Sequence, residues 1–184
     1  MSQIRLTTAL GAAASCLVLA ATVDRASAAP VLTTLLSFNG SNGANPAATL
    51  TIDRNGTLYG TTRFGGPNVD SSGTGYGTVF ALARQDYSAP VTVFAFSGQN
   101  GANPSSALVL DRPGRLFGTT SGGGASNAGT VFELSDAGAG SFTSLASFSS
   151  GVGVDPTSLA AMPPRRLGSA YTLYGTTLQG GSGG

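Results

Sequence analysis

The sequence predicts an all-β fold built from four-stranded repeat units of the β-propeller type, in an incomplete, open arrangement. Three observations predict it. A block of the chain returns with a period of 52 to 58 residues. Each copy holds runs of five to seven residues rich in Phe, Val, Leu and Thr, separated by Gly, Asn and Pro, as is typical of strands and turns. One of these runs is apolar on both faces, which indicates sheets stacked on either side of it.

The first 28 residues predict a secretory signal peptide with a helical apolar segment. Arg5 precedes an apolar run over 6–23, and small residues at 26–29 place the expected cleavage between Ala28 and Ala29. A retained membrane anchor is the alternative, because the run has 18 residues. We therefore expect a repeat region over 29–184 that is secreted to the periplasm, the cell surface or the medium, with no membrane span after cleavage.

Residues 38–62 align with 96–120 without a gap, and a third copy follows at 148–177. Each unit is expected to contain four strands, which in the best-defined copy are "LYGTT" (58–62), "GTVFAL" (77–82), "PVTVFAF" (90–96) and "SALVLD" (106–111). The two apolar faces of the third strand carry equivalent residues in every copy: Phe38, Phe96 and Phe148 on one face, and Leu35, Val93 and Leu145 on the other.

The predicted strands are too few for a closed ring. We count eleven, whereas four blades of four strands need about 16. An incomplete ring leaves open sheet edges, and these favour association with other strands. The count therefore predicts a truncated piece of a longer repeat protein, with self-association through the open edges as the alternative.

The pattern "LYGTT", "GTVF", "NG–NP" and again "LYGTT" resembles the GloVer tandem repeat of exported bacterial proteins, whose anchoring signals vary. The resemblance covers nearly all of residues 29–184, as about two and a half units. The third unit departs from the pattern, because Pro163 replaces the turn acid found at Asp53 and Asp111. The resemblance implies an extracytoplasmic repeat module and supplies no reaction or ligand.

The repeated Gly-Thr-Thr block has a chemical and a structural interpretation. A threonine nucleophile needs a nearby base, and the chain has no His and no Lys. Glycine between β-forming residues instead allows strands to crowd together. We therefore predict a structural role for the three copies of the signature: Tyr59, Gly60, Thr61, Thr62, Phe117, Gly118, Thr119, Thr120, Tyr174, Gly175, Thr176 and Thr177.

Other motifs predict turns rather than sites. "DRNG" (53–56) and "DRPG" (111–114) begin like calcium loops but lack the later oxygen ligands, so we expect turns. "NGANP" (42–46 and 100–104) is likewise interpreted as a turn. The Gly-rich segment 121–129 has no following Lys, which disfavours a phosphate loop. No catalytic residue, metal ligand or cofactor is expected.

The long loop 65–77 is the candidate ligand loop. It holds Asn68, Asp70 and Tyr76, and polar groups beside an aromatic ring suit a neutral sugar. A solvated insertion is the alternative.

Composition limits the partners. Charged residues make up 9% of the chain, and residues 29–184 carry seven Arg and seven acids. Because this balance is neutral, we expect no nucleic-acid partner. The leading hypothesis is a non-catalytic structural, surface or interaction module with an extracellular glycan or protein as partner. A polysaccharide hydrolase or lyase is the alternative, in which Asp70 and Asp155 are the candidate acids.

Overall fold

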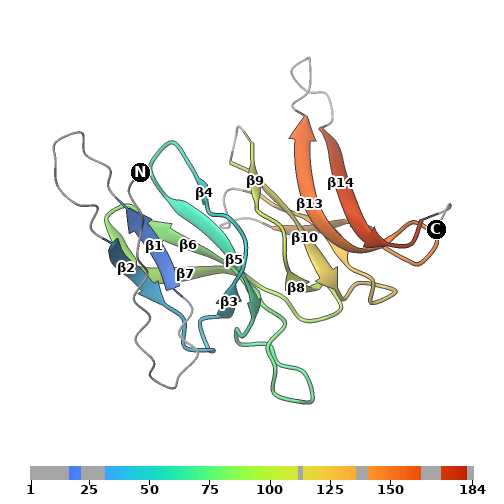
Figure 1. Cartoon of the computed structure of the whole chain (residues 1–184), viewed down its shortest axis with the longest axis horizontal. Helices are drawn as coiled ribbons and strands as arrows, with labels where there is room; N and C mark the ends of the chain where they lie inside the picture. The colour runs from blue at the N-terminus through green and yellow to red at the C-terminus, as the bar shows by residue number, and fades with distance from the viewer. Residues whose placement is uncertain (1–16, 22–31, 112–113, 136–140, 163–170, 182–184) are drawn as a thin grey trace, which may run out of the picture.

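The protein is described by a computed structural model that covers residues 17–21, 32–111, 114–135, 141–162 and 171–181. Within these residues every regular element is a β-strand, and all strand pairs inside the sheets are antiparallel. The predicted all-β class is confirmed (Figure 1). The β-propeller assignment stays a prediction.

Two complete units have the same strand order. In the first, β3 (Ala44–Pro46) and β4 (Thr51–Ile52) both pair with β5 (Leu58–Phe64), which pairs with β6 (Thr78–Ala83) and then β7 (Asp86–Ala95). The second unit repeats this order with β8 (Ala102–Pro104), β9 (Val109–Leu110), β10 (Leu116–Gly122), β11 (Thr130–Leu134) and β12 (Phe142–Ser147). Sequence equivalence is therefore matched by structural equivalence.

Two half units flank the complete ones. At one end β1 (Leu17–Ala21) pairs with β2 (Leu32–Ser37), and at the other β13 (Val154–Met162) pairs with β14 (Thr172–Gln179). Figure 1 places the two hairpins at opposite ends of the molecule. The half units thus carry different halves of the repeat: β2 corresponds to the last strand of a unit, and β14 carries the third copy of the Gly-Thr-Thr signature.

The predicted N-terminal signal helix is wrong. Residues 17–21 form strand β1, which pairs with β2 from Leu17 opposite Ser37 to Ala21 opposite Leu32. A short run of Leu, Val and Ala suits a helix or a buried strand, so its pattern does not decide between them. Pairing with β2 favours the strand, because the backbone N–H and C=O groups at the edge of β2 need partners that a second strand supplies. The other residues of the predicted signal peptide lie outside the described residues.

The predicted fourth strand and the "NGANP" turn also need correction. Residues 41–42 form a turn, but Ala44–Pro46 is strand β3. The expected fourth strand, which is "ATLTID" (48–53) in the first unit and equivalent to 106–111, is reduced to β4. Asn45 has a left-handed backbone with φ of 57°, and Pro46 has no N–H group for a continued ladder. The two residues therefore divide the run into two short strands, and the second unit repeats this division.

The core lies between successive sheets. Phe38 packs edge-on against Phe80, with ring centroids 5.0 Å apart, and Phe96 packs against Phe132 in the same way at 5.2 Å. All four rings are buried. The opposite face of the third strand is less buried than predicted: Leu35 and Val93 are half-buried, and Leu145 is 44% exposed. One face of this strand therefore provides most of its core contacts.

Candidate ligand-binding pocket

The Gly-Thr-Thr signature is buried in the first two units. Thr62 and Thr78 join their hydroxyl groups across β5 and β6 at 2.8 Å, and Thr120 and Thr130 do the same across β10 and β11. All four threonines are inaccessible to solvent. Because hydroxyl groups buried and paired in this way cannot reach a ligand, the contacts favour the structural interpretation.

The third copy of the signature lies in β14 and has a different environment. Tyr174, Gly175 and Thr176 are exposed, and Thr177 is half-buried. The Thr176 hydroxyl lies 2.8 Å from that of Ser158 on β13. The same sequence is therefore a core strand twice and a surface strand once.

The acids of the two predicted turns bind their own loops. Asp53 Oδ1 accepts hydrogen bonds from the backbone N–H groups of Asn55 and Thr57, each at 2.8 Å. Asp111 Oδ1 accepts the equivalent bond from Arg115 at 2.8 Å, and Asp111 Oδ2 forms an ion pair with the Arg115 guanidinium at 2.7 Å. Within the described ranges, no three His, Cys, Asp or Glu residues gather as metal ligands.

The predicted ligand loop does not bring its three candidate residues together. The Asn68 amide donates to the carbonyls of Ala95 and Phe96, at 3.2 and 3.0 Å, and so holds the loop against β7. Asp70 accepts bonds from Ser72 and Thr74 inside its own turn, and the Ser72 hydroxyl lowers the pKa of its carboxyl group. Tyr76 is half-buried and packs against the core. Each candidate is thus occupied by a local contact.

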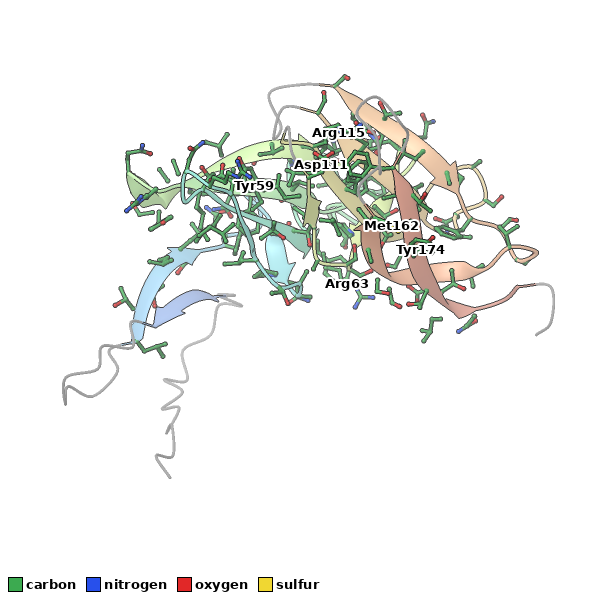
Figure 2. All side chains as sticks on the ribbon, turned by 90° about the horizontal axis from the view of Figure 1, so that it is seen from above. Tyr59, Arg63, Asp111, Arg115, Met162 and Tyr174 are labelled. Atoms are coloured by element: carbon green, nitrogen blue, oxygen red, sulfur yellow. The ribbon has the colours of Figure 1, made fainter. Side chains whose placement is uncertain are left out.

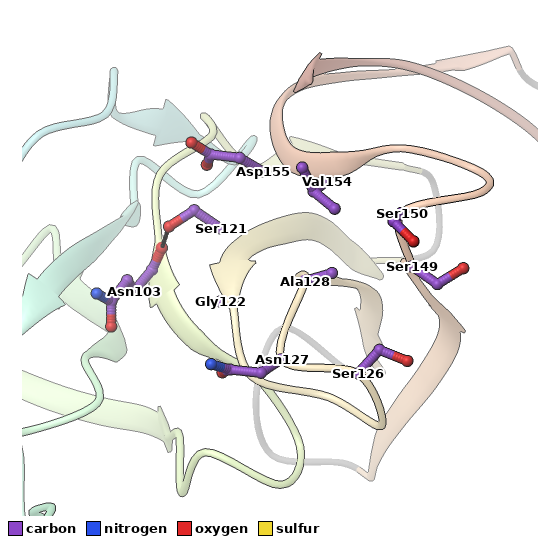
Figure 3. A pocket seen from close by; sticks show the side chains of 10 residues that line it. All are labelled: Asn103, Ser121, Gly122, Ser126, Asn127, Ala128, Ser149, Ser150, Val154 and Asp155. Carbon is purple, nitrogen blue, oxygen red and sulfur yellow. Dashed lines mark hydrogen bonds between the residues drawn. The ribbon is translucent and has the colours of Figure 1, made fainter. Parts of the chain in front are cut away.

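A polar pocket instead opens where the second unit meets β13. Its volume is about 500 Å³, and Figure 3 shows the side chains that line it. The lining carries one charged group, the Asp155 carboxylate, together with amide and hydroxyl groups. Ten residues form it: Asn103, Ser121, Gly122, Ser126, Asn127, Ala128, Ser149, Ser150, Val154 and Asp155.

Three pocket residues have a left-handed backbone. The φ angles of Asn103, Asn127 and Asp155 are 57°, 52° and 54°, and Asn45 is the only other described non-glycine residue with positive φ. Asn and Asp tolerate this conformation best among residues with a side chain. Non-glycine residues in sparsely populated conformations cluster at functional sites. Their gathering here is the feature that distinguishes this pocket from the other surface hollows.

Hydrogen bonds hold these residues in place. The Ser121 hydroxyl donates to the Asn103 carbonyl at 2.9 Å, and the Gly123 N–H donates to Asn127 Oδ1 at 2.9 Å. The Asp155 N–H donates to the Ala128 carbonyl at 3.1 Å. Among the described residues, the Asn103 side-chain amide and the Asp155 carboxylate have no hydrogen-bond partner. The walls are fixed while these polar groups remain available.

A model of the Gloeobacter/Verrucomicrobia repeat matches residues 11–184. The chain belongs to this repeat family. No curated protein and no solved structure matches it. The match agrees with the GloVer resemblance and includes the residues of β1.

Sequence reasoning missed the pocket of this family member. Asn103 was assigned to a turn, and Asp155 was considered only as a catalytic acid. The available signal was the repeated Asn or Asp before proline, at Asn45, Asn103 and Asp155. A residue before proline normally adopts an extended backbone, so a left-handed one cannot be predicted from that pattern alone.

Proposed function

We propose that this chain is a non-catalytic interaction module that binds a neutral, hydroxyl-rich ligand of the glycan class. The pocket between the second unit and β13 carries the proposal. Its free amide and carboxylate groups, on Asn103 and Asp155, suit sugar hydroxyl groups as donors and acceptors. No Arg contributes to its lining, so an anionic ligand has no charge partner there.

The environments of the acids support binding rather than hydrolysis. Glycoside hydrolysis uses two carboxyl groups on either side of the scissile bond. The pocket lining supplies one, Asp155. Asp111 and Glu133 both form ion pairs with the Arg115 guanidinium, at 2.7 and 3.5 Å. Asp70 is held in its own turn.

Export is also part of the proposal, and the sequence alone supports it. Export with signal cleavage would change the fold, because cleavage between Ala28 and Ala29 removes β1 and leaves β2 without this partner. The N-terminal residue of the protein recovered from a bacterial host, measured by intact mass, tests export. A mature N-terminus at Ala29 supports it, and a chain retained in the cytoplasm with residues 1–28 contradicts it.

Titration with a panel of neutral oligosaccharides, followed by calorimetry, tests binding. The variant Asn103→Gly removes the amide and tolerates the left-handed backbone, and Asp155→Asn removes only the charge. Each is expected to weaken saturable binding by about three- to tenfold, the effect of one hydrogen bond. Asn45→Gly is the matched control, because Asn45 has the same φ and repeat position but does not line the pocket.

Two outcomes contradict the proposal. If no oligosaccharide shows saturable binding, or if Asn45→Gly weakens binding as much as Asn103→Gly, the pocket is not the ligand site. Release of reducing ends that disappears in Asp155→Asn would replace binding by catalysis.

A further inference from the structure

We propose that copies of this chain associate head to tail by strand complementation, with β14 of one copy paired with β1 of the next. The C-terminal half unit of one copy and the N-terminal half unit of the other would then form one complete four-stranded sheet. This inference goes beyond ligand binding and does not depend on it. It concerns the chain that keeps residues 17–21, because the cleavage after Ala28 proposed above removes β1.

The first observation is the register of β1. Leu17 lies opposite Ser37 as Thr78 lies opposite Ala95 and Thr130 opposite Ser147. The register shifts after the second residue in all three strands, between Val18/Leu19, Val79/Phe80 and Val131/Phe132. Strand β1 therefore holds the position of the "GTVF" strand, and the β1–β2 hairpin has the pairing of β6–β7 and β11–β12.

The second observation is that the two hairpins have complementary edges. In both complete units the "GTVF" strand pairs on its other side with a "LYGTT" or "LFGTT" strand, β6 with β5 and β11 with β10. Within the described residues, β1 has only β2 as a partner and β14 has only β13. Strand β1 thus lacks a signature strand, and β14 is a signature strand that lacks a "GTVF" strand.

The third observation is the exposure of β13–β14. Tyr174 is 57% exposed, whereas its equivalents Tyr59 and Phe117 are 5% and 2% exposed. Leu178 and Met162, on the same hairpin, are 65% and 44% exposed. Figure 2 shows Met162 and Tyr174 on this outlying pair of strands. The equivalent Tyr59 is buried in one cluster with Leu108 and Leu116 of the following unit. The cover that Tyr174 lacks is therefore a following sheet, which the first complete unit of a second copy would supply.

The phenylalanine ladder gives a fourth observation. Phe38 packs on Phe80 and Phe96 packs on Phe132, each in the "GTVF" strand of the following sheet. Phe148, the next in the series, is half-buried and has no ring partner among the described residues. In β1 the position equivalent to Phe80 and Phe132 is Leu19. Phe148 has no such strand in a following sheet of its own copy. In the proposed assembly, β1 of a second copy supplies that strand, with the apolar Leu19 at the position of Phe80 and Phe132.

The occupant is a second copy, because β1 and β14 lie at opposite ends of one molecule (Figure 1). Neither edge strand carries a charged residue, over Leu17–Ala21 or Thr172–Gln179. Proteins normally protect exposed edges with charges, proline or bulges. One contact is not reproduced, since Leu17 replaces Thr78 and Thr130, so the buried hydroxyl pair is absent at this junction.

Disulfide cross-linking tests the register. If β1 and β14 pair as β11 and β10 do, Leu17 of one copy lies opposite Thr177 of the other, as Thr130 lies opposite Thr120. In a Cys16→Ser background, Leu17→Cys with Thr177→Cys is expected to give intermolecular disulfides under mild oxidation. Val18→Cys with Thr177→Cys is the control, because adjacent strand residues point to opposite faces. We expect at least about a tenfold lower yield from it, since the Cβ atoms then point apart.

Light scattering on the full chain tests the association itself. Its mass is expected to rise with concentration above the 18.1 kDa of one copy. Thr176→Pro in β14 and Val18→Pro in β1 should each remain monomeric, because proline interrupts an edge ladder. Mixing these variants should restore a dimer, since each keeps the edge that the other lacks. Circular dichroism establishes that both variants stay folded.

A monomeric chain at every concentration overturns the proposal. So does equal cross-linking of the two cysteine pairs, which would indicate contact without the expected register. If Thr176→Pro associates as strongly as the wild type, another surface is responsible. The association requires residues 17–21, so a chain cleaved after Ala28 is expected to be monomeric.

Discussion

At the residue scale, Tyr59 and Phe117 occupy the same position in successive units and differ by one hydroxyl group. Both are buried. Burial raises the pKa of the Tyr59 phenol, and the nearby charge of Asp53 raises this pKa further. The Tyr59 hydroxyl lies 3.4 Å from Asp53 Oδ2, to which it donates a hydrogen bond. The Tyr59 phenol of the first unit therefore loses its proton at a higher pH than an ordinary tyrosine does.

Tyr59→Phe should make the protein less sensitive to high pH. Because the native pKa of Tyr59 is raised, the native state holds its proton more tightly than the unfolded state, whose pKa is about 10. The resulting stability is present below about pH 10 and is lost as the pH rises through the native pKa. Urea unfolding at neutral and alkaline pH measures this loss in both proteins. An identical loss in Tyr59→Phe would show that other groups cause the alkaline destabilisation.

The second unit replaces this phenol–carboxylate contact with an ion-pair cluster. Arg115 bridges Asp111 and Glu133, and its guanidinium carbon lies 4.5 Å from the centre of the Tyr171 ring. Figure 2 shows Arg115 beside Asp111. The first unit has Thr57 at the position of Arg115, so it cannot form the cluster. Equivalent turns are therefore stabilised by different chemistry, although the backbone is the same.

At the element scale, the central glycine of the two buried signature strands, β5 and β10, allows close packing against the neighbouring strand. A Cβ atom at Gly118 would lie 2.5 Å from Cζ of Phe132, and one at Gly60 would lie 2.6 Å from Cζ of Phe80. Both phenylalanine rings are buried in the core. Glycine is therefore needed here because the aromatic ring of the adjacent strand lies directly over it.

Gly118→Ala should destabilise the fold by about 1–3 kcal/mol, the usual effect of overpacking a core. Gly122→Ala, on the same strand β10, is the matched control. Its new Cβ would meet its nearest neighbour at 3.8 Å, and its φ is not positive. Chemical denaturation measures both changes in the free energy of unfolding. If the two variants were equally stable, the ring contact would not be the reason for glycine at this position.

Most strands could be predicted, because the repeat presents the same strand sequence at equivalent positions of successive units. Residues 58–62 were expected to form a strand and lie within β5, and 77–82 nearly coincide with β6. The N-terminal segment was not predictable in this way, since Leu17–Ala21 shares little sequence with "GTVFAL". Its strand depends on tertiary pairing with β2. Local composition therefore predicted the wrong secondary structure.

The site was harder to predict than the fold. The candidate loop was selected by polarity, but the Asn68 amide and the Asp70 carboxylate bind their own backbone surroundings. The pocket instead combines Asn103 with Asp155, 52 positions further along the chain. Such a combination depends on how successive units stack, and no single copy of the repeat encodes it.

At the scale of the whole molecule, stability depends on contacts between successive sheets. One cluster of buried residues joins the two complete units and includes Phe96 and Phe132, and a second joins β2 to the first unit through Phe38 and Phe80. No residue of β14 belongs to the described core clusters. The described core therefore consists of two successive clusters along the repeat and does not extend to β14.

This distribution of the core predicts unequal costs for three equivalent substitutions. Phe96→Ala removes a fully buried ring and should lower the free energy of unfolding by about 3–5 kcal/mol. Phe38→Ala should lower the free energy of unfolding slightly less, because its ring is 3% exposed and belongs to a smaller cluster. Phe148→Ala should cost the least in dilute solution, since this ring is only half-buried.

Urea denaturation at two protein concentrations measures this order and relates it to assembly. If β1 of a second copy covers the third unit, the cost of Phe148→Ala should increase with concentration, because binding to the native state adds to its stability. The cost of Phe96→Ala should not change, since its cluster lies within one copy. Equal costs for all three substitutions in dilute solution would mean that the core extends equally to the third unit. A Phe148→Ala cost that stays constant with concentration would mean that its ring gains no cover on association.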